Sequence, residues 1–350
     1  ACGIQNNLGL ATPNRKFAGN GLALNAKLNP ARNGSRTVNL AGGPGASVGD
    51  ELVVETTAVA HGGHMIARHE GQVLFVRHAI PGEHVKVVVT QREKSFLRAD
   101  VIEVLRAAPE RKTPECKHAG VCGGCDFQHI TEAGQLRLLG QVVSEQLARI
   151  AHETWDIEVE SVGDFTHWRT RMDWSIDADG QPGLLKHRSH TVIPRPDCVI
   201  ADRNLPQTSG VWTGPSVKTV ATSTGQKFIV SDQDLPAQTG PIDGHINRKG
   251  QPAVESNVAR EVVFDRVFEL SPTNFWQVHP RAAETLVSAV MEFARPQQGE
   301  TVFDLYSGVG LFTRFLAEAV GESGRVHSIE GNRLSHSFAQ RNLAQFPQVQ

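Results

Sequence analysis

The sequence contains no run of about eighteen consecutive apolar residues, the length that a membrane-spanning helix requires. Its first residues also lack the charged-then-apolar order of a secretory signal, so we predict a cytoplasmic protein that does not enter the membrane. A strong excess of one charge is missing as well, because the formal net charge is only −2. Any nucleic-acid site must therefore depend on local basic patches.

Cysteine is scarce, with five residues in a chain of 350, and this excludes the disulfide framework of a small secreted domain. Three of the five lie close together, between Cys116 and Cys125. Such clustering favours a metal site over cross-links.

The first half of the chain changes character near residue 51. Residues 1–50 are rich in Gly, Asn, Ala and Pro without helical or strand periodicity, so we predict a disordered or non-native leader. Residues 51–108 carry short β-branched runs separated by GG, HEG and PGE turns. This spacing predicts a small OB-like β-barrel, a fold that can bind RNA.

Residues 109–270 predict a β-rich middle domain that opens with a cysteine-rich loop and a helix. Its strands are expected in WRTRMDWSID, HTVIPRPDCVI, QKFIVS and REVVFDRVFEL, broken by a Gly/Pro/Ser/Thr-rich stretch at 206–245. Residues 271–350 then alternate helix and strand, which indicates the start of a Rossmann-like α/β domain. The predicted fold class is therefore α+β, with several domains.

The α/β segment contains only two predicted strands. A doubly wound sheet needs several more strands to bury them on both faces. The sequence thus predicts that these 350 residues are a fragment whose last domain is incomplete.

Four cysteines outside the leader form a candidate metal site: Cys116, Cys122, Cys125 and Cys198. Four thiolates suit either a [4Fe–4S] cluster or a structural zinc ion. The remote fourth cysteine and the five-residue first spacing favour iron–sulfur, whereas His118 and His129 keep a mixed zinc site open. The glycines of the CGGC turn allow backbone amides to approach the sulfurs.

A second candidate site lies in VFDLYSGVGLF, residues 302–312, and RVHSIEGN, residues 325–332. One strand ends in Asp304 and is followed by Gly308 and Gly310, and a second strand ends in Glu330. Glycines allow close approach of a ligand, and an acid after the second strand can accept from ribose hydroxyls. The short turn favours S-adenosylmethionine (SAM) over NAD, and the absence of GK[ST] excludes a P-loop.

Basic residues cluster in two regions, together with aromatic residues: Arg92, Lys94, Arg98, Arg106, Arg111 and Lys112, then Arg169, Arg171, Lys186, Arg188 and Arg195, interleaved with Phe75, Phe96, Trp168 and Trp174. Such a pattern can stack bases and contact phosphates. A solvated charged surface over core aromatics explains each single residue at least as well.

In combination, these motifs resemble the TrmA/RumA type of RNA (uracil-5-)-methyltransferase, a class I SAM-dependent family, in the branch with an N-terminal TRAM domain. The resemblance spans residues 51–350 and includes AHGGHMIARHEGQVLFVRHAIPGEHVKVVV, CKHAGVCGGCDFQHI, WRTRMDWSI, DCVIAD, NFWQVHP and DLYSGVGLF. It implies that the four cysteines bind [4Fe–4S], that Gln277, Tyr306 and Glu330 contact SAM, and that Asp304, Gly308 and Gly310 shape its pocket. From the residues alone, Gln277 would be a helix-capping or solvent-exposed side chain.

The family chemistry implies methylation of uridine C5 in structured RNA, either rRNA or tRNA, by a monomer. A thiolate adds at C6, C5 takes the methyl group from SAM, and a base then removes the C5 proton while the thiolate leaves C6. With four cysteines assigned to the cluster and Cys2 in the leader, no nucleophile remains, so we expect the nucleophile and base beyond Gln350 and an inactive fragment.

Two other functions are compatible with parts of the pattern. One is a non-catalytic RNA-binding protein with a structural zinc or iron–sulfur site. The other, a radical-SAM methylthiotransferase with a TRAM domain, is disfavoured because CxxxCxxC is absent.

Overall fold

The computed structural model describes residues 11–13, 46–194, 197–247 and 257–350. Contacts divide these residues into two compact units, one made of 11–113 and 129–160 and the other of 114–128 and 161–350. The leader predicted for residues 1–50 falls almost wholly outside the described residues. Among the residues that are described, no helix is long and apolar enough to cross a membrane.

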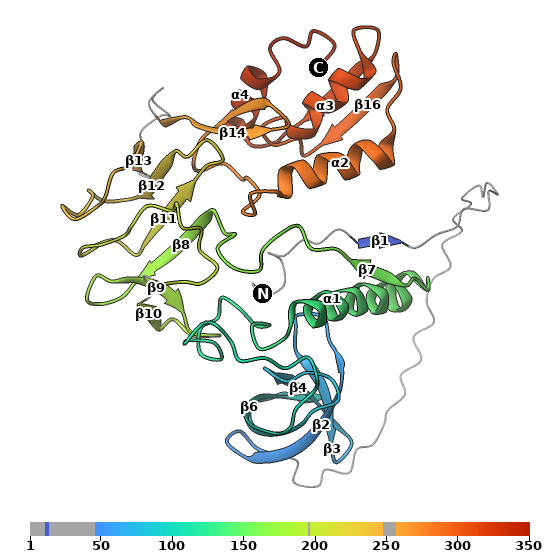
Figure 1. The fold of residues 1–350 in the computed structure, drawn as a ribbon, viewed down its shortest axis with the longest axis vertical. Helices are drawn as coiled ribbons and strands as arrows, with labels where there is room; N and C mark the ends of the chain where they lie inside the picture. The colour runs from blue at the N-terminus through green and yellow to red at the C-terminus, as the bar shows by residue number, and fades with distance from the viewer. Residues whose placement is uncertain (1–10, 14–45, 195–196, 248–256) are drawn as a thin grey trace. The chain divides into compact units, whose positions relative to one another are not determined.

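The first unit is built on a closed five-stranded barrel (Figure 1), which confirms the predicted barrel. Its strands close in the order β2-β3-β4-β6-β5, with β4 and β6 parallel. Alternate side chains of each strand, such as Leu74 and Val76, are fully buried inside the barrel. The strands are β2 (Glu51–Val59), β3 (Met65–His69), β4 (Gln72–Arg77), β5 (His84–Arg92) and β6 (Phe96–Arg106).

A helix completes this unit. Helix α1 (Glu132–Gln146) begins at Thr131, whose hydroxyl accepts a hydrogen bond from Gly134 N at 3.3 Å, and it ends in a π-helical turn (Leu147–Ala151). The short strand β7 (Ile157–Val159) follows and pairs with β1 (Ala11–Pro13). In the same unit, Arg111 makes two hydrogen bonds of 2.6 Å to the buried Glu83 carboxylate, which fixes the chain where it leaves the barrel.

The second unit contains a six-stranded sheet in the order β10-β9-β8-β11-β12-β13. All neighbouring strands are antiparallel except β12 and β13. Strand β11 lies within the stretch that the sequence predicted as a break, because that stretch is rich in Gly, Pro, Ser and Thr; Val217 and the last three residues of β11 are nevertheless buried. The strands are β8 (Arg171–Ile176), β9 (Pro182–Leu185), β10 (Val192–Pro194), β11 (Ser216–Ala221), β12 (Lys227–Ser231) and β13 (Gly244–Asn247).

The run REVVFDRVFEL, predicted as one strand, is instead a hairpin of β14 (Ala259–Val263) and β15 (Arg266–Leu270). Its two-residue turn, Phe264 and Asp265, has φ of 46° and 63°. Positive φ at both positions is typical of a type I′ turn, which matches the twist of paired strands. The sequence lacks the usual Asn-Gly signal, so the turn is not visible from the residue types.

The end of the chain has the predicted α/β order (Figure 1): α2 (Ala282–Ala294), β16 (Thr301–Leu305), α3 (Leu311–Val320), β17 (Arg325–Ile329) and α4 (Arg333–Asn342). Strands β16 and β17 are parallel, and α3 packs on them. Residues 348–350 begin to pair with the other edge of β17, since Val326 N donates to Gln348 O and Gln350 N to Val326 O. Side chains on one face of the two strands, including Phe303, Leu305 and Ile329, are exposed.

Candidate functional site

The turn between β16 and α3 carries the candidate cofactor site. Its backbone is held against the end of β17, because the amides of Tyr306 and Ser307 both donate to Ile329 O, at 2.8 and 3.1 Å. Tyr306, Gly308 and Gly310 all have positive φ, of 65°, 60° and 90°. The Tyr306 side chain is 91% exposed. Tyr306 is therefore held in an uncommon backbone conformation with its ring directed to solvent.

Glu330 closes the other side of this turn. Its carboxylate accepts hydrogen bonds from Gly308 N at 2.8 Å and from Asn332 N at 2.6 Å. A carboxylate offers about four acceptor positions, so two remain for further donors. The structure thus joins two residues that the sequence selected from different strands, and Glu330 retains the capacity to accept from hydroxyl groups.

Asp304, by contrast, is buried beneath the turn. The Thr313 hydroxyl donates to it at 2.5 Å and contacts Ser328 Oγ at 3.3 Å. Burial raises the pKa of Asp304, and the hydrogen bonds from the Thr313 hydroxyl and backbone amide oppose that shift. Asp304 therefore holds Thr313, in the first turn of α3.

The two glycines of the turn have different surroundings. A Cβ at Gly310 would lie 2.9 Å from Leu343 Cδ1, so this position is limited by packing as well as by its φ. A Cβ at Gly308 would meet no atom within 4 Å. Space is therefore open beside Gly308, on a backbone segment that a ligand can approach.

The loop that carries Gln277 is anchored to the same region. Trp276, its neighbour, packs in one hydrophobic core with Val309 of the glycine turn. Asn274 Nδ2 donates to Ser335 Oγ of α4 at 3.0 Å, and its Oδ1 accepts from Ser271 N at 2.8 Å. Gln277 itself is half-buried, on a loop fixed from both sides.

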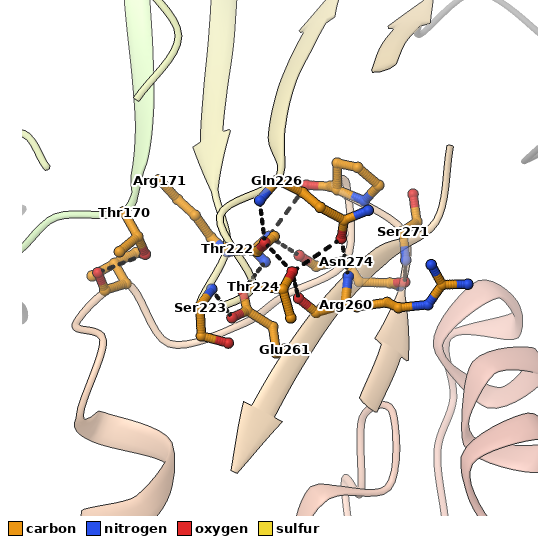
Figure 2. A network of polar contacts seen from close by, with 12 residues as sticks. Thr170, Arg171, Thr222, Ser223, Thr224, Gln226, Arg260, Glu261, Ser271 and Asn274 are labelled. Carbon is orange, nitrogen blue, oxygen red and sulfur yellow. Dashed lines mark hydrogen bonds and ion pairs between the residues drawn. The ribbon is translucent and has the colours of Figure 1, made fainter. Parts of the chain in front are cut away.

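A buried ion pair supports this loop (Figure 2), and the sequence did not predict it. Arg171 Nη2 lies 3.2 Å from Glu261 Oε1, with side-chain exposures of 4% and 6%. Arg171 Nη1 also donates to Pro272 O and Asn274 O, at 3.3 and 3.4 Å, while Ser223 N donates to Glu261 at 2.8 Å. The pair therefore connects β8 and β14 to the segment that precedes Gln277.

Three residues of the predicted basic and aromatic patch, Arg171, Trp168 and Trp174, are buried, so the prediction is wrong for them. Arg171 is not a surface residue, because its guanidinium is used inside the second unit. Trp168 and Trp174 belong to the hydrophobic core and have no exposed face for a base. Arg195 lies outside the described residues.

The second unit brings the four candidate cysteines together. The pKa of the Cys125 thiol is raised to about 12, mainly by burial and also by the nearby Cys198, Cys122 and Cys116, and a hydrogen bond with Gln128 acts in the opposite direction. Cys198 and Cys125 share one core. Cys125 and Cys198 are thus neighbours in the fold, although they are 73 positions apart in the sequence.

Backbone amides are directed at two of the sulfurs. His118 N donates to Cys116 Sγ and Gly124 N to Cys122 Sγ, both at 3.4 Å. Within the described ranges, no three His, Cys, Asp or Glu side chains are arranged to hold a single metal ion.

The structure thus combines a closed five-stranded barrel with an α/β segment that carries a glycine turn. The TRAM domain family matches residues 29–102. A protein of Streptomyces coelicolor named as an uncharacterized RNA methyltransferase is 40% identical over 344 residues, which cover 87% of this chain and 74% of the relative. This chain belongs to that family of RNA methyltransferases, the TrmA/RumA type with a TRAM domain.

Two further proteins extend the comparison. The 23S rRNA (uracil(1939)-C(5))-methyltransferase RlmD of Acinetobacter baylyi is 28% identical over 333 residues, covering 83% of this chain and 72% of the relative. The tRNA (uracil-54, C5)-methyltransferase of Pyrococcus abyssi, solved in complex with S-adenosyl-L-homocysteine, has the same fold with a TM-score of 0.60. That likeness is at 19% identity and covers 85% of this chain and 78% of the other.

Proposed function

We propose that this protein takes part in SAM-dependent methylation of C5 of a uridine in structured RNA. The observation that carries the proposal is the turn in which Glu330 accepts from Gly308 N and retains acceptor positions, next to an open backbone. Membership of an RNA methyltransferase family and the uracil-C5 activity named for the Acinetobacter relative support the same reaction.

The proposed cofactor contacts divide into direct and indirect ones. Glu330 accepts from the ribose hydroxyls, Gly308 allows close approach, and Tyr306 and Gln277 contact the rest of SAM. Asp304 and Gly310 act by holding the turn. When bound, SAM supplies an electrophilic methyl group, and these residues orient it.

Isothermal titration of the 350-residue chain with S-adenosyl-L-homocysteine tests the site. We expect Glu330→Gln to weaken binding roughly 10- to 150-fold, because an amide cannot replace every acceptor of a carboxylate that hydrogen-bonds the ligand. Glu322→Gln, an exposed change in the same α/β segment, is the matched control. Equal affinity for the wild type and the Glu330 variant, or no binding by the wild type, would favour the non-catalytic RNA-binding alternative.

We further propose that Cys116, Cys122, Cys125 and Cys198 hold a [4Fe–4S] cluster with a structural role. The cluster would join the loop at 114–128 to the segment around Cys198, two parts of the second unit that are distant in sequence. The amides directed at Cys116 and Cys122 support thiolate ligands.

Anaerobic purification with iron and sulfide analysis tests the cluster. We expect a brown protein with about four irons per chain, as a cubane with four thiolate ligands requires. Cys198→Ala should lose the chromophore. Lys117→Ala, which changes an exposed side chain of the same loop, should keep it. A colourless protein with one zinc per chain would replace this proposal by the zinc site.

The reaction also requires a thiol that adds at uridine C6 and a base that removes the C5 proton. If four cysteines bind the cluster, none of them is available as this nucleophile. We therefore expect the 350-residue chain to bind cofactor without methylating RNA, and transfer of labelled methyl groups from SAM would contradict this expectation.

A further inference from the structure

Asn274 joins the loop that carries Gln277 to helix α4. The residue is buried, with only 5% of its surface exposed. Its Oδ1 accepts a hydrogen bond from Ser271 N at 2.8 Å, and its Nδ2 donates to Ser335 Oγ at 3.0 Å. Because a backbone N–H can only donate, Ser271 requires the oxygen of the amide and thereby turns the NH2 group towards Ser335. The Asn274 side chain is thus held in one orientation.

Ser335 stands at a helix position that commonly serves another partner. Helix α4 is capped by Asn332, whose Oδ1 accepts from Ser335 N at 3.0 Å. In a capping box, a Glu or Gln at the third helical position bonds back to the backbone N–H of the cap. Here that N–H donates to Glu330 at 2.6 Å instead, and the Ser335 hydroxyl accepts from Asn274. The first turn of α4 is therefore bonded to Glu330 and to Asn274, rather than closed on itself.

These contacts form a continuous path of hydrogen bonds within the second unit. From Asn274 the path reaches the Ser335 hydroxyl, and through the Ser335 amide it reaches the side chain of Asn332. The Asn332 amide then donates to Glu330. Asn274 also precedes Gln277 by three positions on the same loop. One buried residue thus connects the two segments that carry Glu330 and Gln277.

The two ends of the Asn274 amide serve different purposes. The oxygen closes a turn with Ser271, since Asn274 N also donates to Ser271 O at 2.9 Å. This turn requires only an acceptor, so it does not explain the bond from Nδ2 to Ser335. The main chain is fixed separately, because Arg171 Nη1 donates to Asn274 O at 3.4 Å. The Ser335 bond is therefore a contact that relates an already ordered loop to α4.

We infer that Asn274 is a positioning residue of the cofactor site, which fixes Glu330 relative to Gln277 through Ser335 and Asn332. The inference rests on the proposed function, because that function makes Glu330 and Gln277 ligand contacts. It adds a residue that does not touch the ligand and acts by keeping two ligand-binding segments at one spacing. A carboxylate that accepts from ribose hydroxyls tolerates little displacement, since hydrogen bonds weaken steeply as their geometry departs from the optimum.

Titration of the 350-residue chain with S-adenosyl-L-homocysteine tests the inference through Ser335→Ala, which removes the acceptor and leaves Glu330 and the Gln277 loop unchanged. The affinity should fall roughly 3- to 30-fold, within the range of coupling between residues of one hydrogen-bond network. In a Glu330→Gln background the same substitution should change affinity less than about 2-fold, because the group through which Ser335 acts is already altered. Ser337→Ala, which removes an exposed hydroxyl from the same helix, is the matched control and should bind with wild-type affinity.

Asn274→Ala breaks the same bond from the loop. Its loss of affinity should not add to that of Ser335→Ala, because both substitutions remove one contact. Asn274→Ala also removes the acceptor of Ser271 N and should be the less stable of the two variants. If it fails to fold, Ser335→Ala, which keeps that acceptor, carries the test.

Amide hydrogen exchange provides a measurement that needs no ligand. The N–H groups of Asn332 and Gly308 both donate to Glu330. They should exchange faster in Ser335→Ala than in the wild type or Ser337→Ala, because the carboxylate that protects them is held less firmly. A loss of affinity with normal exchange at these two amides would show that the Ser335 bond is a structural contact only, and would overturn the inference.

The inference can fail separately from the proposed function. Wild-type affinity in Ser335→Ala, or a loss that simply adds to that of Glu330→Gln, would overturn the positioning role and leave the proposed function intact. Absence of binding by the wild type, or wild-type affinity in Glu330→Gln, would contradict the proposed function and the inference with it.

Discussion

The barrel and the glycine turn carry their candidate functional residues in opposite ways. In the barrel, the half-buried Phe75, Phe96 and Arg98 lie outside a closed sheet whose core of Val, Leu and Ala is complete without them. In the glycine turn, Glu330 and Asp304 hold the backbone and define the site at the same time. Fold and function are therefore separable in the first region and coupled in the second.

The coupling has a physical cause. A site at the carboxyl ends of parallel strands is built from backbone that leaves the sheet, and its amides need partners. Here a side chain provides them: Glu330 accepts from Gly308 N at 2.8 Å and from Asn332 N at 2.6 Å. A closed barrel satisfies its amides between its own strands, so its outer side chains are available for binding.

The largest effect is expected at the buried ion pair. Arg171→Met should lower the free energy of unfolding by about 3–5 kcal/mol, because Glu261 is left as an uncompensated buried charge. Urea unfolding of the single variant and of Arg171→Met with Glu261→Gln measures the effect, and the double variant should recover part of it. Arg260→Gln, which removes an exposed partner of Glu269, is the control and should cost less than about 1 kcal/mol.

Substitution of the two glycines of the turn should have different effects: Gly310 mainly affects stability, and Gly308 mainly affects cofactor binding. Gly310→Ala should cost about 3 kcal/mol, from strain at its positive φ and from the contact with Leu343. Gly308→Ala should lower the free energy of unfolding by about 1 kcal/mol, from backbone strain alone. It should nevertheless weaken binding of S-adenosyl-L-homocysteine at least as strongly as Gly310→Ala does. Thermal unfolding and titration on both variants make the comparison; a Gly308 variant with normal affinity would remove this glycine from the cofactor site.

These differences also explain what the sequence could predict. The barrel is predictable because turns punctuate its β-branched runs. The candidate cofactor site is suggested by Gly308 and Glu330, which each follow a predicted strand, and by Asp304 near the end of the first. The Arg171–Glu261 pair is not predictable, since its partners are separated by 90 residues and pair through tertiary contact. Thr313 offers a weak signal in retrospect, as a hydroxyl residue in the first turn of the helix that follows the glycines.

A smaller effect, on pH dependence, is expected at His279. Burial and then Arg281 lower its pKa, and Asp164 acts in the opposite direction. Because the folded state binds fewer protons than the unfolded state below the ordinary pKa of about 6.5, His279 should cost stability as pH falls from that value through its lowered pKa. Urea unfolding at several pH values should show a shallower acid loss for His279→Asn.

His245 offers a second, independent test, because burial lowers its pKa as well, whereas Asp234 raises it. His245→Gln should remove a separate part of the acid loss, and the double variant should be flatter than either single one. Identical pH profiles for the wild type and the His279 variant would contradict a lowered pKa of His279 in the folded state.

The smallest effect on stability is expected at the barrel surface, and it tests the comparison most directly. Phe75→Leu should change the free energy of unfolding by less than about 1 kcal/mol, since its ring lies outside the core and leucine keeps part of its contacts. Leu74→Ala, at the neighbouring buried position of β4, should cost about 2–5 kcal/mol. If urea unfolding instead gave similar losses for the two variants, Phe75 would be a structural residue, and the separation of fold from function in the barrel would not hold.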